Sequence, residues 1–77
     1  LPTVRELQEF EGLTERQAEV ARLLARGLSN RQIAARLDVS PNTARHLAQT
    51  VLEKLRLHSR KALGLRLLER ARRWRSG

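Results

Sequence analysis

Three helix-start signals follow one another closely along this chain and constrain its fold more than any other feature. Thr14 and Ser29 are each followed three residues later by glutamine, a capping box that satisfies two unpaired backbone N–H groups at a helix start. Ser40 followed by Pro41 is a third start signal, because a proline loses no hydrogen bond at the first helical position. Strand signals are missing. The sequence therefore predicts an all-α fold.

The helix that begins near residue 41 has the clearest apolar stripe. Its apolar residues recur at helical spacing and predict a helix over about 41–55 with one face on a core; they are Ala44, Leu47, Ala48, Val51, Leu52 and Leu55. The opposite face is polar and comprises Asn42, Arg45, His46, Gln49, Glu53 and Arg56. This helix can therefore pack on one side and bind on the other.

Two further helices are predicted outside this central region. Ser59 is a capping residue for a fourth helix over about 60–73. The weaker signal of Thr3 with Glu6 predicts a short extra helix at the N-terminus. We expect an N-terminal lead-in or linker over 1–12, a domain over 13–73 and a tail over 74–77.

Charge and composition narrow the function. The 77 residues hold 16 Lys and Arg against 8 Asp and Glu, a net charge of +8 that favours a polyanionic partner, nucleic acid before membrane. Without cysteine, and with two histidines far from any acidic cluster, we expect no metal site and no cofactor. No nucleophile–base pair or phosphate-binding glycine loop is present, so we expect no enzyme.

Other absences bear on location. No apolar run approaches the roughly 18 residues of a membrane span, and no signal-like start is visible, so we expect a cytoplasmic protein without a membrane partner. Methionine is missing even at position 1, which indicates a segment of a longer protein with a regulatory domain upstream.

Residues 29–48 have the pattern of a helix-turn-helix, a short helix, a tight turn and a second helix with a polar outer edge. Within 13–63 the chain resembles the LuxR/FixJ/NarL type of DNA-binding domain. The shared motifs are LT-x-R at 13–16, GLSN-x-x-IA at 27–34, SPNTAR at 40–45, KL at 54–55 and SR at 59–60. The resemblance implies a four-helix domain in the output region of a bacterial transcription regulator, with the helix over 41–55 in the DNA major groove.

Three positions depart from the family pattern. Leu47 stands where histidine is frequent, and its place at the edge of the apolar stripe indicates packing. Asp38 replaces the usual turn glycine. Arg56 replaces the glycine after KL, so either Arg56 adopts a left-handed conformation or the helix continues by about one residue.

The residues expected to contact bases are Arg45, His46 and Gln49. Arginine can grip O6 and N7 of guanine, and glutamine can grip N7 and N6 of adenine. Phosphate contacts are expected from helix starts and flanking side chains; the candidates are Asn30, Arg31, Asn42, Thr43, Thr50 and Lys54. Glu53 would repel phosphate, which indicates that the helix has left the groove by that turn.

Double-stranded DNA, a second copy of the chain and RNA polymerase are the candidate partners. A homodimer is expected through the helix over 60–73, and the candidate contacts are Leu63, Leu67, Ala71 and Trp74. Two alternatives remain at this point. A sigma-factor-like promoter-recognition domain shares the turn, and a basic helical protein-interaction module shares the charge; the second predicts little salt-sensitive duplex binding.

Overall fold

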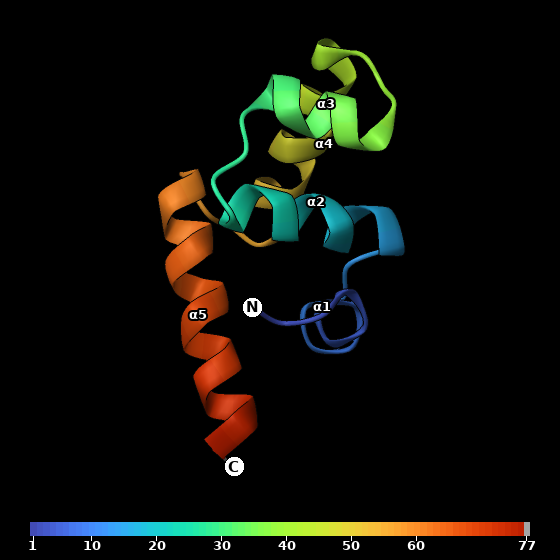
Figure 1. Cartoon of the computed structure of the whole chain (residues 1–77). Helices are drawn as coiled ribbons and strands as arrows, with labels where there is room; N and C mark the ends of the chain where they lie inside the picture. Colours follow the sequence, from blue (N-terminus) through green and yellow to red (C-terminus); the bar gives the residue numbers. More distant parts are fainter. Residues whose placement is uncertain (77) are drawn as a thin grey trace.

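Five α-helices and no strand occur in the part of the chain that the computed structural model describes, the backbone of residues 1–76 and the side chains of residues 1–73. The helices are α1 (Val4–Glu11), α2 (Glu15–Ala25), α3 (Asn30–Leu37), α4 (Pro41–Lys54) and α5 (Arg60–Ser76) (Figure 1). The all-α prediction and the short extra helix, α1, are confirmed. α4 ends one residue before the predicted boundary, and α5 continues three residues beyond it.

The predicted capping residues begin the helices. Thr3, Thr14 and Ser29 each form a complete capping box at the start of α1, α2 and α3. Ser40 Oγ accepts a hydrogen bond from the third backbone N–H of α4 at 3.1 Å, and Ser59 Oγ accepts the equivalent bond in α5 at 3.1 Å. Local side-chain chemistry thus defines every helix start.

Four helices end on a left-handed residue. The first is α1, which Gly12 ends at φ 69°. The other three share a hydrogen-bond pattern. Gly27, Asp38 and Arg56 follow α2, α3 and α4 with φ of 88°, 56° and 57°. In each case the next backbone N–H reaches back to a carbonyl five residues earlier, the Schellman arrangement. For Arg56 this resolves the two alternatives: the arginine takes the left-handed conformation and α4 stops, although its Cβ makes that conformation costly.

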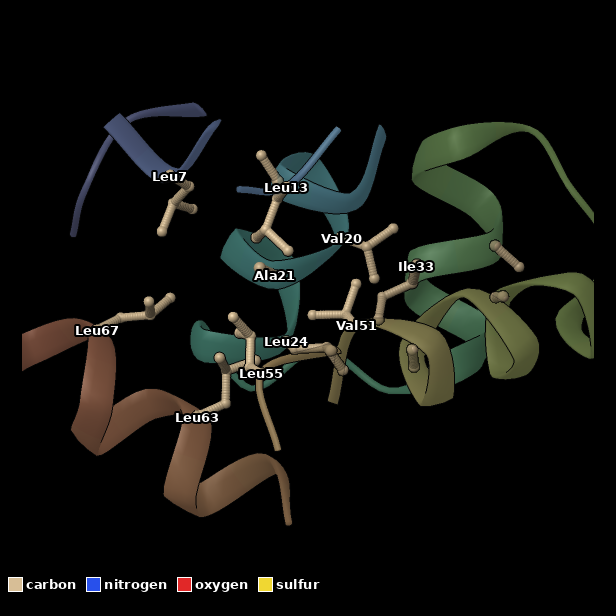
Figure 2. Packing of buried hydrophobic residues seen from close by; sticks show 14 residues of the cluster. Leu7, Leu13, Val20, Ala21, Leu24, Ile33, Val51, Leu55, Leu63 and Leu67 are labelled. Atoms are coloured by element: carbon tan, nitrogen blue, oxygen red, sulfur yellow. The ribbon is translucent and has the colours of Figure 1, made fainter. Parts of the chain in front are cut away.

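One hydrophobic core holds the helices together, and each helix contributes to it (Figure 2). Fully buried members are Leu7 of α1, Val20 of α2, Ile33 of α3, Val51 of α4, and Leu63 and Leu67 of α5. The burial of Leu7 shows that residues of the expected N-terminal lead-in pack on the rest of the domain.

The core also corrects the expected dimer contacts. Leu63 and Leu67 are fully buried and Ala71 is 8% exposed, so these side chains pack within the chain and are not accessible to a second copy. The prediction was wrong for these three because it assigned the apolar stripe of α5 to a partner rather than to α2. The side chain of Trp74 lies outside the described residues. Among the α5 side chains of residues 60–73, the large apolar ones that are exposed are Leu65, at 64%, and Leu68, at 56%.

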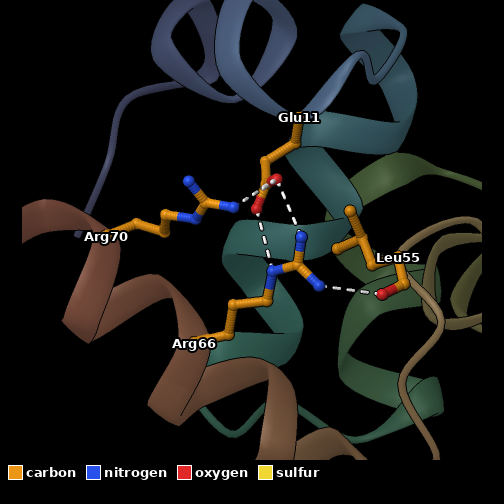
Figure 3. A network of polar contacts seen from close by, with 4 residues as sticks. All are labelled: Glu11, Leu55, Arg66 and Arg70. Atoms are coloured by element: carbon orange, nitrogen blue, oxygen red, sulfur yellow. Dashed lines mark hydrogen bonds and ion pairs between the residues drawn. The ribbon is translucent and has the colours of Figure 1, made fainter.

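A polar network fastens α5 to α1 (Figure 3). Arg66 donates two hydrogen bonds to the Glu11 carboxylate and a third to the backbone carbonyl of Leu55 at 2.9 Å. Arg70 approaches the same carboxylate at 3.9 Å. The Glu11 side chain is only 3% exposed, so its charge is stabilised by these arginines rather than by water.

Candidate nucleic-acid interface

α3 and α4 form the predicted helix-turn-helix, packed against each other across a short turn (Figure 1). Ile33 and Ala34 of α3, and Ala44 and Ala48 of α4, are buried where the two helices meet. Small side chains at three of these positions allow the helix backbones to approach closely. The pair therefore forms a rigid support for the outer face of α4.

The outer face of α4 carries the three predicted base-contacting residues. Arg45, His46 and Gln49 are all exposed, whereas Ala44 and Ala48 beside them are buried. Leu47 is half-buried and packs against the core, as its place on the stripe predicts. Burial of one stripe thus fixes the direction of the opposite one, so these three polar side chains project away from the domain.

Arg45 is oriented by its own helix. Its Nη2 donates a hydrogen bond to Oδ1 of Asn42 at 2.9 Å, one turn earlier. The other guanidinium N–H groups remain available as donors, and Asn42 keeps its amide N–H groups. Held in this way, the guanidinium loses less conformational entropy when it binds an acceptor such as a guanine edge.

Two candidate phosphate contacts on the later half of α4 are engaged within the chain. Thr50 donates its hydroxyl to the carbonyl of His46 at 2.9 Å, and Lys54 Nζ donates to Oε1 of Gln17 at 3.0 Å. Both side chains are exposed. A phosphate contact from Thr50 would therefore replace an existing bond, whereas the ammonium of Lys54 has further donors.

The starts of α3 and α4 hold the remaining candidates. Arg31 is exposed at the first turn of α3, and Asn42 and Thr43 are exposed at the first turn of α4, where Thr43 accepts a hydrogen bond from Ser40 Oγ at 3.0 Å. The first backbone N–H groups of a helix have no partner within it and carry partial positive charge. Both helix starts are thus suited to an anion.

Arg60, a residue to which the sequence assigned no separate role, controls the start of α3. From the first turn of α5, its Nη1 donates to the carbonyl of Leu28 at 3.1 Å and its Nη2 donates to Oδ1 of Asn30. Asn30 is consequently half-buried and oriented by an arginine 30 residues away in the chain. The only available signal was that Arg60 belongs to the SR motif.

Other kinds of site find little support in the described residues. Within residues 1–73, histidine, aspartate and glutamate do not gather in threes at metal-binding distance. None of the helices over 1–76 combines the length and apolar character needed to cross a membrane.

The chain matches one family over most of its length. Residues 11–66, more than half of the chain, match the family described as bacterial regulatory proteins, luxR family. The match includes both helices of the helix-turn-helix and the first part of α5. Comparison with solved structures gave no match.

Curated relatives are response regulators. The chain is 39% identical over 72 residues to a nitrate/nitrite response regulator protein homolog of Haemophilus influenzae, covering 94% of this chain and 35% of that protein. It is 40% identical over 68 residues to the two-component response regulator PprB of Pseudomonas aeruginosa, covering 88% and 25%. It is 42% identical over 60 residues to the nitrate/nitrite response regulator protein NarP of Escherichia coli, covering 78% and 28%. The chain spans about a quarter to a third of the length of these relatives.

Proposed function

Because the chain belongs to the luxR family of bacterial regulatory proteins, as a DNA-binding helix-turn-helix domain of transcription regulation, we propose that it binds double-stranded DNA sequence-specifically with α4 in the major groove. The observation that carries this proposal is the exposed row of Arg45, His46 and Gln49 on a helix whose opposite side is buried. We propose no catalytic activity for the domain.

These three side chains recognise the bases. Arg45 reads a guanine, Gln49 reads an adenine, and His46 contacts a base edge between or beside them. The hydrogen bond that the Arg45 guanidinium donates to Oδ1 of Asn42 supports this assignment, because it holds the arginine ready to bind. Glu53, exposed farther along α4, marks where the helix leaves the groove.

Phosphate contacts position the domain on the duplex. At the start of α3 we assign Asn30 and Arg31 to this role. On α4 we assign Asn42, Thr43, Thr50 and Lys54. Support comes from their exposure or half-exposure on the two helices of the helix-turn-helix. These contacts displace counterions and provide affinity for any sequence.

We propose further that two copies bind one site, with their α4 helices about one helical turn apart on a near-palindromic sequence. Leu65 and Leu68 support pairing through α5, because they are large apolar side chains that the described part of this helix, residues 60–73, exposes. They replace the buried residues that the sequence pattern suggested.

The rest of the regulator is inferred from the relatives. Their length, three to four times the matched segment, supports a further domain in the regulator, and we propose that it is a regulatory domain upstream of this one. As part of a transcription regulator, the protein would act in the cytoplasm, with RNA polymerase as a further partner.

Selection of bound duplexes from a random pool, followed by competition at two salt concentrations, tests the proposal. A short enriched motif with half-sites at a fixed spacing, and affinity that falls steeply with salt, is the expected result. Binding without any enriched motif, or without salt dependence, would contradict it and favour the protein-interaction module.

A further inference from the structure

An open pocket of about 280 Å³ lies between α1, α2 and α3, and none of its lining residues is among the proposed DNA contacts. Its apolar lining comes from Val4, Leu23 and Leu37, three partly buried side chains at the edge of the core. Its charged lining comes from Glu19, Arg22, Arg26 and Arg36. Three guanidinium groups and one carboxylate thus meet around an apolar floor.

The guanidinium groups that line this pocket have too few hydrogen-bond acceptors within the chain. Glu19, the one carboxylate in the lining, forms an ion pair with Arg16 at 3.8 Å. Within residues 1–73, the side chains of Arg22, Arg26 and Arg36 make no hydrogen bond or ion pair. The Nε atom of Arg22 is moreover shielded from solvent without an acceptor. A buried guanidinium N–H in this situation is costly, since it has lost water and gained nothing in exchange.

We propose that this pocket, the three-arginine pocket, binds an acidic segment of a protein partner, with an aspartate or glutamate carboxylate among the guanidinium groups of Arg22, Arg26 and Arg36. Arginine binds carboxylates through paired, charge-assisted N–H donors. A carboxylate would therefore supply the acceptors that these three guanidinium groups lack. An apolar residue next to the acidic one in the segment packs on the floor of Leu23 and Leu37.

A protein segment fits the pocket better than DNA does. None of the lining residues belongs to the set assigned to bases or phosphates on α3 and α4. The sugar–phosphate backbone offers anions but no aliphatic side chain for the apolar floor. A peptide offers both groups within two neighbouring residues, so the combined lining selects a protein partner.

Titration of the 77-residue chain with a blocked leucine–glutamate–leucine peptide, followed by NMR of the arginine Nε–H signals, tests the proposal. The Arg22 Nε–H signal should shift and saturate, whereas the same peptide with glutamine in place of glutamate should leave it in place. Arg22→Gln should weaken peptide binding about tenfold, the effect of one lost charge-assisted hydrogen bond.

Matched variants keep the test decisive. Arg26→Gln and Arg36→Gln should each weaken binding in the same direction, and they carry the test if Arg22→Gln fails to fold, because both side chains are exposed. Arg72→Gln removes the same charge at an exposed position of α5, outside the pocket, and should leave peptide affinity unchanged.

Three results would overturn the proposal. One is the absence of a saturable Arg22 shift, or an equal shift with the glutamine peptide. Another is a shift caused by random duplex DNA together with a loss of DNA affinity in Arg22→Gln, which would make the pocket a phosphate site. The last is a concentration-dependent shift without peptide, which would assign the pocket to a second copy of the chain.

Discussion

Arg66 and Glu11, 55 residues apart in the chain, form a two-bonded ion pair that ties α5 to α1. Nε of Arg66 donates to Oε2 of Glu11 at 3.1 Å, and Nη2 donates to Oε1 at 3.0 Å. The Arg66 side chain is 31% exposed and the Glu11 side chain is 3% exposed, so the arginine shields the acid from water. In a chain whose acidic residues are outnumbered two to one, this carboxylate holds two helices together.

Arg66→Gln should destabilise the domain by about 2 kcal/mol, below the usual range for breaking a buried pair because Arg70 remains near Glu11. The loss arises mainly from the buried carboxylate left with one partner at 3.9 Å. Urea unfolding followed by circular dichroism measures it.

The control for that experiment is Arg5→Gln, which breaks an exposed pair with Glu9 at 4.0 Å. It should change the unfolding free energy by less than about 0.5 kcal/mol. Equal effects of the two substitutions would show that the Arg66–Glu11 pair contributes no more than a surface contact.

Arg56→Gly should stabilise the domain by about 1 kcal/mol, the strain of a left-handed arginine minus the extra entropy of a glycine in the unfolded chain. Gly27→Ala is the matched reversal, because Gly27 ends α2 at φ 88° and an added Cβ would meet nothing within 4 Å. It should destabilise by about the same amount. A loss of stability in Arg56→Gly would mean that the arginine side chain makes a compensating contact. Thermal and urea unfolding of both variants provide the comparison.

The sequence predicted all five described helices because their start signals are local. Thr14, Ser29 and Ser40 each act through a backbone group three residues away, and such signals can be read without knowing the fold. The apolar stripe of α4 likewise predicted which way Arg45 projects. That stripe specifies a buried side, and it does so whatever the helix packs against.

The features that could not be predicted from the sequence depend on contacts between elements that are distant in the chain. The stripe of Leu63 and Leu67 showed that one side of α5 is buried, but not whether α2 or a second copy covers it. Arg60 and Arg66 looked like other arginines of a basic helix, because their partners on α3 and α1 are brought to them only by the fold. Long-range polar pairs leave no periodic signal in a sequence.

Arg60→Lys should lower affinity for selected and random duplexes alike, by about fivefold, because it removes the forked hydrogen bonds to Leu28 and Asn30 that hold the start of α3. The charge is kept, so the dependence of affinity on salt should not change. Fluorescence anisotropy at several salt concentrations measures both quantities. Unchanged affinity for both duplexes would show that these hydrogen bonds do not position the start of α3 for DNA binding.

Arg31→Gln should weaken binding to every duplex and reduce the slope of log affinity against log salt by about 0.9, the value for one phosphate contact. Arg31 is exposed at the start of α3, so the substitution should leave stability nearly unchanged. Arg72→Gln is the charge-matched control on α5. If both variants reduce the slope equally, the effect comes from net charge and not from a contact at Arg31.

Arg45→Ala should remove discrimination at one base pair of the selected site, by at least about tenfold, while leaving affinity for random DNA largely intact. The distinction follows from geometry, because the guanidinium projects from the outer face of α4 and its hydrogen bond to Asn42 orients it without burying it. Asn42→Ala provides a graded test of the same arrangement: Arg45 keeps its donors but loses its support, so discrimination at the same base pair should fall by less. Competition anisotropy with every substitution at each position of the selected site locates that base pair. An equal loss on selected and random DNA in Arg45→Ala would show that this arginine binds phosphate, and discrimination would then rest on His46 and Gln49.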